Sequence, residues 1–161
     1  MQSLTDLGAP IGALLKARGE TVAVSESSTG GLVSAALLAV PGASAYFMGG
    51  AAVYTLPARN ALLGIDLDDH PGVRSASEPY AALAAAAIRE RLGTVWGLAE
   101  TGAAGPTGNR YGDAAGHTCI AIVGPVNRTL TVETGDDDRE ANMWRFAKET
   151  LAAFEAALSS P

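Results

Sequence analysis

Residues 25 to 31, with the sequence SESSTGG, could hold a catalytic nucleophile. They follow the apolar run TVAV at 21 to 24 and precede a second apolar run, LVSAALLAV. A serine hydroxyl that follows a buried strand can attack a carbonyl carbon when a base removes its proton. The same small polar residues are also favoured at the start of a helix, where free N–H groups can face an anion. From this stretch alone, both interpretations stay open.

A second glycine-rich loop, TGAAGPTGN at 101 to 109, follows another apolar run at 94 to 99. Ligands of open α/β sheets bind at the carboxyl ends of strands, and glycine lets the backbone come close to them. We therefore expect the two loops to form a pocket for a phosphorylated or carboxylated small molecule. Neither loop carries the P-loop or the GxGxxG fingerprint, and ordinary strand–helix turns are the alternative interpretation.

The sequence offers few bases that could activate a serine. Only two histidines exist: His70 lies in a polar loop, where a solvated position is expected, and His117 begins a strand and could point either way. The only lysines, Lys16 and Lys148, lie on predicted helices and are most simply solvated. The spacing of these residues nominates no Ser-His-Asp triad.

Metal binding is not expected, and no cofactor is implied. One cysteine and two distant histidines show no ligand spacing. The acidic run at 136 to 138 is more typical of the N-terminal cap of a helix than of a cation site.

The net charge and the apolar runs exclude several partners. With 17 acidic and 11 basic residues, the chain has a net charge of −6 and no general attraction for nucleic acid or an anionic membrane. The apolar runs are too short to span a bilayer, and the N-terminus lacks the pattern of a signal peptide. Together with the single cysteine, this predicts a cytoplasmic protein.

The elements that must position these loops alternate between helix and strand. Helical spacing or caps predict helices at 4–18, 32–40, 57–63 and 78–92 and a last helix that ends at 158. Strands are predicted at 21–24, 47–55 and 94–99, followed by a hairpin of 117–123 with 128–134. This order predicts an α/β protein, a three-layer α/β/α fold with a central mixed sheet and a single domain over residues 1–161.

Six segments together resemble a known family. ESSTGG, PGASAYFMGGAAVYT, LLGI, SEP, TGAAGPTGN and TGDDDRE occur in this order within residues 4 to 158. This pattern resembles the CinA C-terminal domain family, whose enzymatic members are nicotinamide mononucleotide deamidases. The resemblance implies a metal-free serine amidohydrolase that converts nicotinamide mononucleotide to nicotinate mononucleotide and ammonia.

The resemblance also assigns catalytic roles, with one departure. Ser27 falls at the nucleophile, and Tyr54 at a tyrosine that assists proton handling. The family's lysine base lies five residues after that tyrosine, where this sequence has Arg59. Arginine stays protonated, so it cannot act as a neutral lysine does. Three alternatives follow: Tyr54, or a tyrosinate favoured by Arg59, is the base; another residue is the base; or the pocket only binds a nucleotide or phosphate.

The expected ligand contacts extend over both glycine loops and the start of the last helix. They comprise Ser28, Thr29, Gly30, Gly31, Thr101, Gly102, Gly105 and Arg139. The expected partner is a small-molecule nucleotide, and the reaction could instead act on another amide or ester. The apolar helix faces would permit a homo-oligomer as well as a monomer core.

Overall fold

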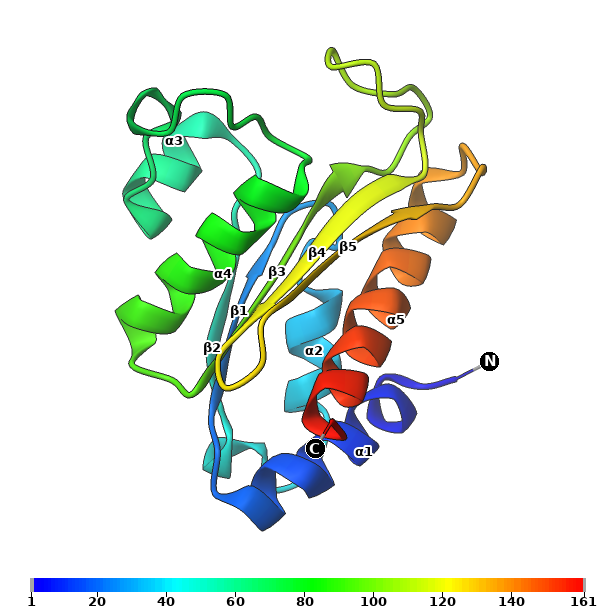
Figure 1. The fold of residues 1–161 in the computed structure, drawn as a ribbon. Coiled ribbons are helices and arrows are strands. Elements are labelled where there is room, and N and C mark those ends of the chain that lie inside the picture. Colours follow the sequence, from blue (N-terminus) through cyan, green and yellow to red (C-terminus); the bar gives the residue numbers. More distant parts are fainter. Residues whose placement is uncertain (1, 161) are drawn as a thin grey trace.

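A five-stranded mixed sheet forms the centre of the protein. The computed structural model describes residues 2 to 160. Strand order is β2-β1-β3-β4-β5, and β1 pairs in parallel with both β2 and β3, whereas β4 and β5 are antiparallel (Figure 1). The strands are β1 (Val22–Glu26), β2 (Phe47–Ala52), β3 (Trp96–Ala103), β4 (His117–Val123) and β5 (Arg128–Glu133).

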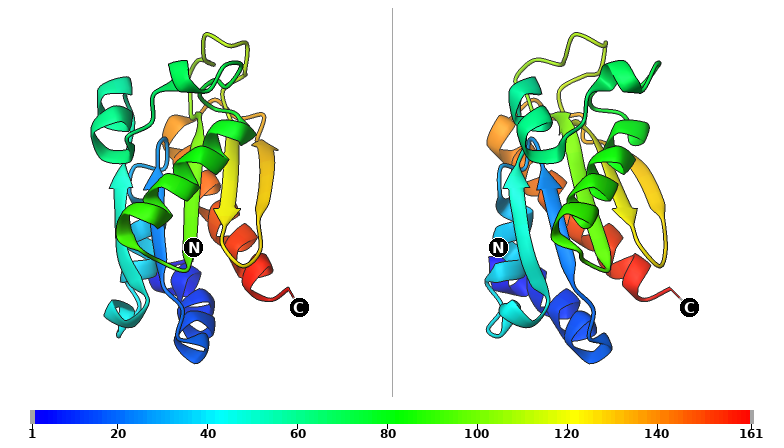
Figure 2. Two further views of the ribbon diagram at one scale, coloured as in Figure 1. Left: turned by 60° about the vertical axis from the view of Figure 1, so that its left-hand side comes forward. Right: turned by 90° about the vertical axis from the view of Figure 1, so that its left-hand side faces the viewer.

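Helices cover both faces of this sheet, which confirms the predicted three-layer α/β/α fold. One face is covered by α1 (Leu4–Arg18), α2 (Leu32–Leu38) and α5 (Arg139–Leu158), and the other by α4 (Glu78–Leu92), as Figure 2 shows. The short α3 (Leu56–Ala58) continues into a π-helical turn at Arg59–Leu63 and lies beside α4.

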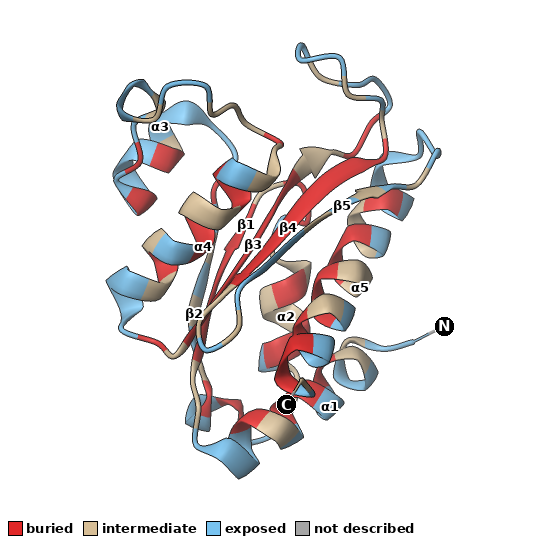
Figure 3. Ribbon diagram, viewed as in Figure 1, coloured by how far each residue is buried: buried red, intermediate tan, exposed pale blue. Residues whose placement is uncertain are grey.

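Two hydrophobic cores hold the layers together, and buried residues line the inner sides of α1, α2, α4 and α5 (Figure 3). Between the sheet and α5, the rings of Trp96 and Phe154 meet edge to face with centroids 5.6 Å apart. The core under α4 is built largely from alanines. At Gly97 the helix backbone comes so close that an added Cβ would lie 2.2 Å from the Ala85 carbonyl oxygen. Small residues therefore let α4 sit directly on β3.

The first three strands end at other residues than the sequence predicts. The strand that begins at TVAV continues through Glu26, and β3 continues through Ala103. Both extensions pair with neighbouring strands of the sheet: Glu26 of β1 pairs with Ala52 of β2, and Thr101 of β3 pairs with Cys119 of β4. The second strand ends at Ala52, so Tyr54 lies beyond it. Periodicity missed these extensions because polar residues in a buried strand depend on partners from other elements.

The helix ends are predicted more accurately. Gly19 closes α1 with a φ of 64°, a left-handed conformation that favours glycine. Ser77 caps α4, and Asp138 caps α5 by accepting the Ala141 N–H at 3.0 Å, which confirms the cap expected within 136 to 138. Gly8, which lowers the helix propensity of α1, lets that helix approach α2, since a Cβ there would lie 2.0 Å from the Ala36 carbonyl oxygen.

Candidate active site

Residues from three parallel strand ends meet in one pocket, defined here as the Ser27 pocket. Ser27 follows β1, Tyr54 lies two residues beyond β2, and Thr101 and Gly102 lie at the end of β3. The connection after β1 passes to one face of the sheet and the connection after β2 to the other. Open α/β sheets bind ligands at strand ends where two neighbouring connections diverge in this way. Arg59 also lines this pocket, whereas the predicted ligand contacts Gly105 and Arg139 do not. The other lining residues are Val53, Ser75, Ala76, Tyr80, Asn109 and Tyr111.

The buried carboxyl group of Glu100 holds the backbone of Ser27. Its Oε2 accepts the N–H groups of Ser27 at 3.1 Å and Thr29 at 3.0 Å, and its Oε1 contacts the hydroxyls of Ser28 and Thr118. Burial raises the pKa of Glu100, and the hydrogen bonds oppose only part of that rise. Since the two hydroxyls at Oε1 can accept as well as donate, a protonated Glu100 satisfies all of these contacts.

A second buried carboxylate, that of Glu26, occupies the N-terminus of α2. It accepts the N–H groups of Gly31 at 3.1 Å, Val33 at 2.9 Å and Ser34 at 2.9 Å. Within the glycine loop, the Gly31 N–H therefore faces a side chain of the protein itself, and binding of an anion by this loop stays a prediction. Ser28, Thr29, Gly30 and Gly31 do not line the Ser27 pocket, and their contacts with a ligand stay a prediction.

Sequence reasoning missed both glutamates. Each lies at the end of an apolar strand segment, VAVSE and WGLAE, where a charged residue needs a partner. A glutamate at the end of an apolar strand segment was thus the sequence signal that could have indicated a buried, hydrogen-bonded carboxyl group. The donors that satisfy Glu26 come from the following loop and helix. Those of Glu100 come from the same loop, more than seventy residues earlier, and from Thr118 on β4. Periodicity along one strand could therefore not reveal either pairing.

Tyr54, which lines the Ser27 pocket, is hydrogen-bonded to Arg139. Arg139 donates from Nη2 to the Tyr54 hydroxyl at 2.9 Å and from Nη1 to the Gly105 carbonyl at 2.5 Å. Arg139 is the first residue of α5, directly after its cap. The structure thus brings three of the predicted residues together, from the segment after β2, the second glycine loop and the last helix.

Arg59 is buried, and it does not contact the Tyr54 hydroxyl. Its Nε donates to the Tyr80 hydroxyl at 3.1 Å, its Nη2 donates to Ser75 Oγ at 2.6 Å, and its guanidinium lies 4.2 Å from the centroid of the Tyr80 ring. The cation beside the Tyr54 hydroxyl is Arg139, not Arg59. Arg59 and Tyr54 are thus not joined by a hydrogen bond, and the choice of base stays a prediction.

His117 points inward, but away from the nucleophile. Its Nε2 lies 2.8 Å from the Ala76 carbonyl oxygen, and its Nδ1 lies 2.5 Å from a carboxylate oxygen of Glu133. Ala76 has a left-handed φ of 54°, and its N–H donates to the Thr101 hydroxyl at 3.2 Å. The histidine therefore supports the pocket wall at Ala76. Within residues 2 to 160, Ser27 itself forms hydrogen bonds only through its backbone, so no base contacts its hydroxyl.

The remaining sequence expectations concern metals and membranes. No group of three or more potential metal ligands occurs among the residues that the structure describes. Across the same part of the chain, none of the helices is long and apolar enough to cross a membrane.

The sequence matches a known protein family over most of its length. The model of the CinA C-terminal domain family matches residues 4–158. CinA-like proteins from Synechocystis sp. and Gloeobacter violaceus are 40% and 43% identical over 134 and 146 residues, which is 83% and 89% of this chain. Because these matches cover 32% and 33% of the relatives, the chain spans about a third of their length.

Solved structures show the same fold. A CinA superfamily protein from Klebsiella pneumoniae 700603 superposes with a TM-score of 0.91 at 25% identity, over 98% of this chain and 99% of that one. A competence or damage-inducible protein from Enterobacter asburiae superposes with a TM-score of 0.87 at 28% identity, over 99% and 100%. On the family match and these relatives, the chain belongs to the CinA C-terminal domain family.

Proposed function

We propose that this protein hydrolyses the carboxamide of nicotinamide mononucleotide, with Ser27 as the nucleophile. The observation that carries the proposal is the Ser27 pocket itself, in which Ser27, Tyr54, Thr101 and Gly102 from three separate strand ends line one hollow. These are the positions at which the resemblance to the family's enzymatic members places catalytic and amide-binding groups.

The chemistry needs a route for one proton. The Ser27 oxygen attacks the amide carbon, the C–N bond breaks, and the nitrogen leaves as ammonia with the proton that the serine gave up. Water then cleaves the acyl-serine ester, which releases nicotinate mononucleotide and restores the hydroxyl. Arg59 cannot carry this proton because it stays protonated, so we assign the transfer to the Tyr54 hydroxyl, which Arg139 orients.

Thr101 is suited to polarise the amide. Its hydroxyl oxygen accepts the Ala76 N–H, so the hydroxyl proton stays available for the carbonyl oxygen of a ligand. A donor fixed in this way stabilises the negative charge that develops during attack.

Ammonia release from nicotinamide mononucleotide tests the proposal. We expect Ser27→Ala to lower kcat by at least about 10⁴-fold if Ser27 is the nucleophile. Ser44→Ala is a matched control, because Ser44 is exposed and does not line the pocket. Wild-type release that does not exceed that of Ser27→Ala would exclude the reaction.

Binding without turnover is the second candidate, and the buried cation of Arg59 favours it. Under this alternative the wild type binds the nucleotide but releases no ammonia, whereas Arg59→Lys creates or raises the deamidase activity by supplying an amine that can be neutral. Rapid turnover by the wild type would eliminate this candidate.

A further inference from the structure

The guanidinium of Arg59 is a buried cation without a carboxylate partner. The side chain is 7% exposed, and within residues 2 to 160 it forms no ion pair. Its two hydrogen-bond partners, Ser75 and Tyr80, are neutral hydroxyls, and its Nη1 is buried with no partner at all among the described residues. Arg74, by contrast, pairs with Asp113 at 2.8 Å. Since an uncompensated buried charge is costly, a guanidinium in this environment is suited to pair with a bound anion.

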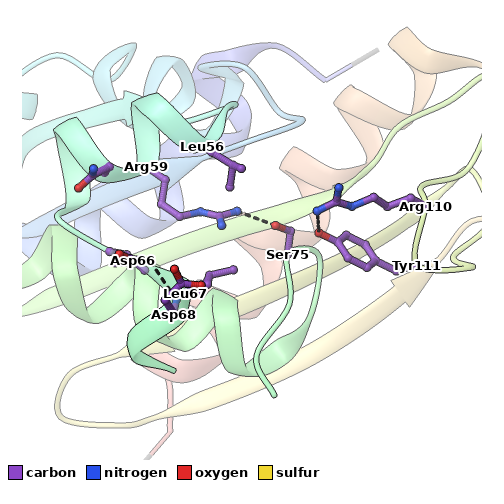
Figure 4. A pocket seen from close by; sticks show the side chains of 10 residues that line it. Leu56, Arg59, Asp66, Leu67, Asp68, Ser75, Arg110 and Tyr111 are labelled. Carbon is purple, nitrogen blue, oxygen red and sulfur yellow. Dashed lines mark hydrogen bonds between the residues drawn. The ribbon is translucent and has the colours of Figure 1, made fainter. Parts of the chain in front are cut away.

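A second cation lies across an adjoining hollow, defined here as the outer pocket and drawn in Figure 4. Arg59, Ser75 and Tyr111 line both this hollow and the Ser27 pocket, so the two hollows adjoin. From the opposite side Arg110 donates to the Tyr111 hydroxyl at 3.2 Å and, like Arg59, forms no ion pair in the described chain. In Figure 4 the side chains of Arg59 and Arg110 extend toward Ser75 from either side.

The sizes of the hollows indicate a ligand that spans both. The Ser27 pocket measures about 260 Å³ and the outer pocket about 360 Å³. Small-molecule sites usually occupy about 300–1,000 Å³. A ligand with its reacting group at Ser27 would therefore extend past Arg59 into the outer pocket.

We propose that Arg59 and Arg110, together with the hydroxyls of Ser75 and Tyr111, form a subsite for the phosphate group of a mononucleotide-sized ligand. Two guanidinium groups match the double negative charge of a phosphate monoester, which a carboxylate would only half neutralise. Asp66 and Asp68 also line the outer pocket, but Figure 4 places them away from Arg110. The negative charge of Asp66 and Asp68 would repel a phosphate, so we place the phosphate between Arg59 and Arg110. Arg59 thus serves as an anion receptor at the position where the resemblance to the family implies a lysine base.

This assignment rests on the proposed function only for the ligand's reacting end, so inorganic phosphate tests the subsite by itself. Calorimetric titration at constant ionic strength should show phosphate binding to the wild type. Arg110→Gln should weaken it about tenfold, the usual effect of one charge-assisted hydrogen bond. Arg110 is exposed, so this variant keeps the fold, whereas Arg59→Gln tests the buried partner. Arg128→Gln, which removes an exposed charge on β5 outside both pockets, should leave binding unchanged. Absence of phosphate binding, or equal loss in Arg128→Gln, would overturn the subsite.

The second arm compares nicotinamide mononucleotide with nicotinamide riboside in the Ser27→Ala background, which prevents turnover. The nucleotide should bind at least about tenfold more tightly, and Arg110→Gln should remove most of that preference. Equal affinity for the two would reject the phosphate subsite while leaving the deamidase proposal intact. Phosphate binding that depends on Arg110, without binding of either pyridine compound, would support the subsite and reject the pyridine substrate.

Discussion

Glu100 accepts the backbone N–H of Ser27 at 3.1 Å, so a buried carboxyl group fixes the proposed nucleophile through its main chain. The same oxygen accepts the Thr29 N–H. Both contacts link Glu100 on β3 to the loop that follows the neighbouring strand β1. Glu100 is therefore a positioning residue. It reaches the nucleophile loop without lining the Ser27 pocket.

Glu100→Gln and Glu100→Ala should differ strongly in stability. The glutamine oxygen can accept both N–H groups while its amide donates to the hydroxyls of Ser28 and Thr118, as a protonated glutamic acid does. Alanine leaves two backbone N–H groups without a partner, at about 1–3 kcal/mol each. Urea unfolding at neutral pH should show a loss of roughly 3 kcal/mol for alanine and little for glutamine. Equal losses would show that an ionised carboxylate is required.

The pH dependence of Glu100 follows from the sign of its pKa shift. Burial raises the pKa of Glu100 in the folded protein above the ordinary value of 4.5. Above pH 4.5 the unfolded chain therefore releases this proton first, and the contribution of Glu100 to stability falls as pH rises toward the folded-state pKa. Glutamine does not titrate, so as pH rises over this range the free energy of unfolding of Glu100→Gln should increase relative to that of the wild type. A relative increase for the wild type would contradict a raised pKa for Glu100.

Thr29 separates the two buried glutamates, and its hydroxyl should be essential to that arrangement. The hydroxyl lies 2.7 Å from Glu26 Oε1 and 3.0 Å from Glu100 Oε2, and the residue is fully buried. Thr29→Val keeps the shape but removes the donor, so we expect a loss of about 2 kcal/mol in the free energy of unfolding. Thr29→Ser retains the hydroxyl and is the matched control. A valine variant as stable as the serine variant would show that the hydroxyl is dispensable.

The layered fold could be predicted because its signals are local. Caps such as Gly19 and Ser77 and the apolar spacing of the helices act within a few residues, and the structure places those ends as expected. The environment of Glu26 could not be predicted, because its burial depends on N–H groups that become available only when α2 folds against β1. Position alone also could not show that Arg59 points to Tyr80 or that Arg139 reaches Tyr54.

Tyr54 and Arg139 should act as one unit in catalysis. If Arg139 works by orienting the Tyr54 hydroxyl, Tyr54→Phe and Arg139→Gln should each lower kcat by about 10²-fold, the low end for a proton-transfer group. The double variant should be no slower than Tyr54→Phe alone, because the two changes remove the same interaction. Arg145→Gln on the same helix controls for loss of charge, since Arg145 is exposed and pairs with Glu149. Fully additive effects would show independent roles.

Gly8 should be intolerant of alanine despite its place in a helix. Alanine at this position would normally stabilise a helix by about 1 kcal/mol. Here the new Cβ would lie 2.0 Å from the Ala36 carbonyl oxygen, so α1 and α2 must separate at a cost of roughly 2–3 kcal/mol. Thermal unfolding should therefore show a lower Tm for Gly8→Ala. A higher Tm would mean that the two helices can part freely.

His117 should stabilise the protein most in its charged form. Both ring nitrogens face acceptors, Glu133 and the Ala76 carbonyl. Although burial opposes the charge, these contacts and nearby Asp113 raise the pKa of His117 above its usual 6.5. Its contribution is thus fully present below pH 6.5 and is lost as pH rises through the folded-state pKa.

Urea unfolding of the wild type and His117→Gln across this range tests the histidine directly. The stability difference in favour of the wild type should be largest below pH 6.5 and should shrink as the imidazolium loses its proton. Glutamine cannot titrate, so the change with pH reports on the histidine rather than on the rest of the chain. A difference that grows with rising pH would mean that His117 is held as a neutral ring, and the wall at Ala76 would then need another source of support.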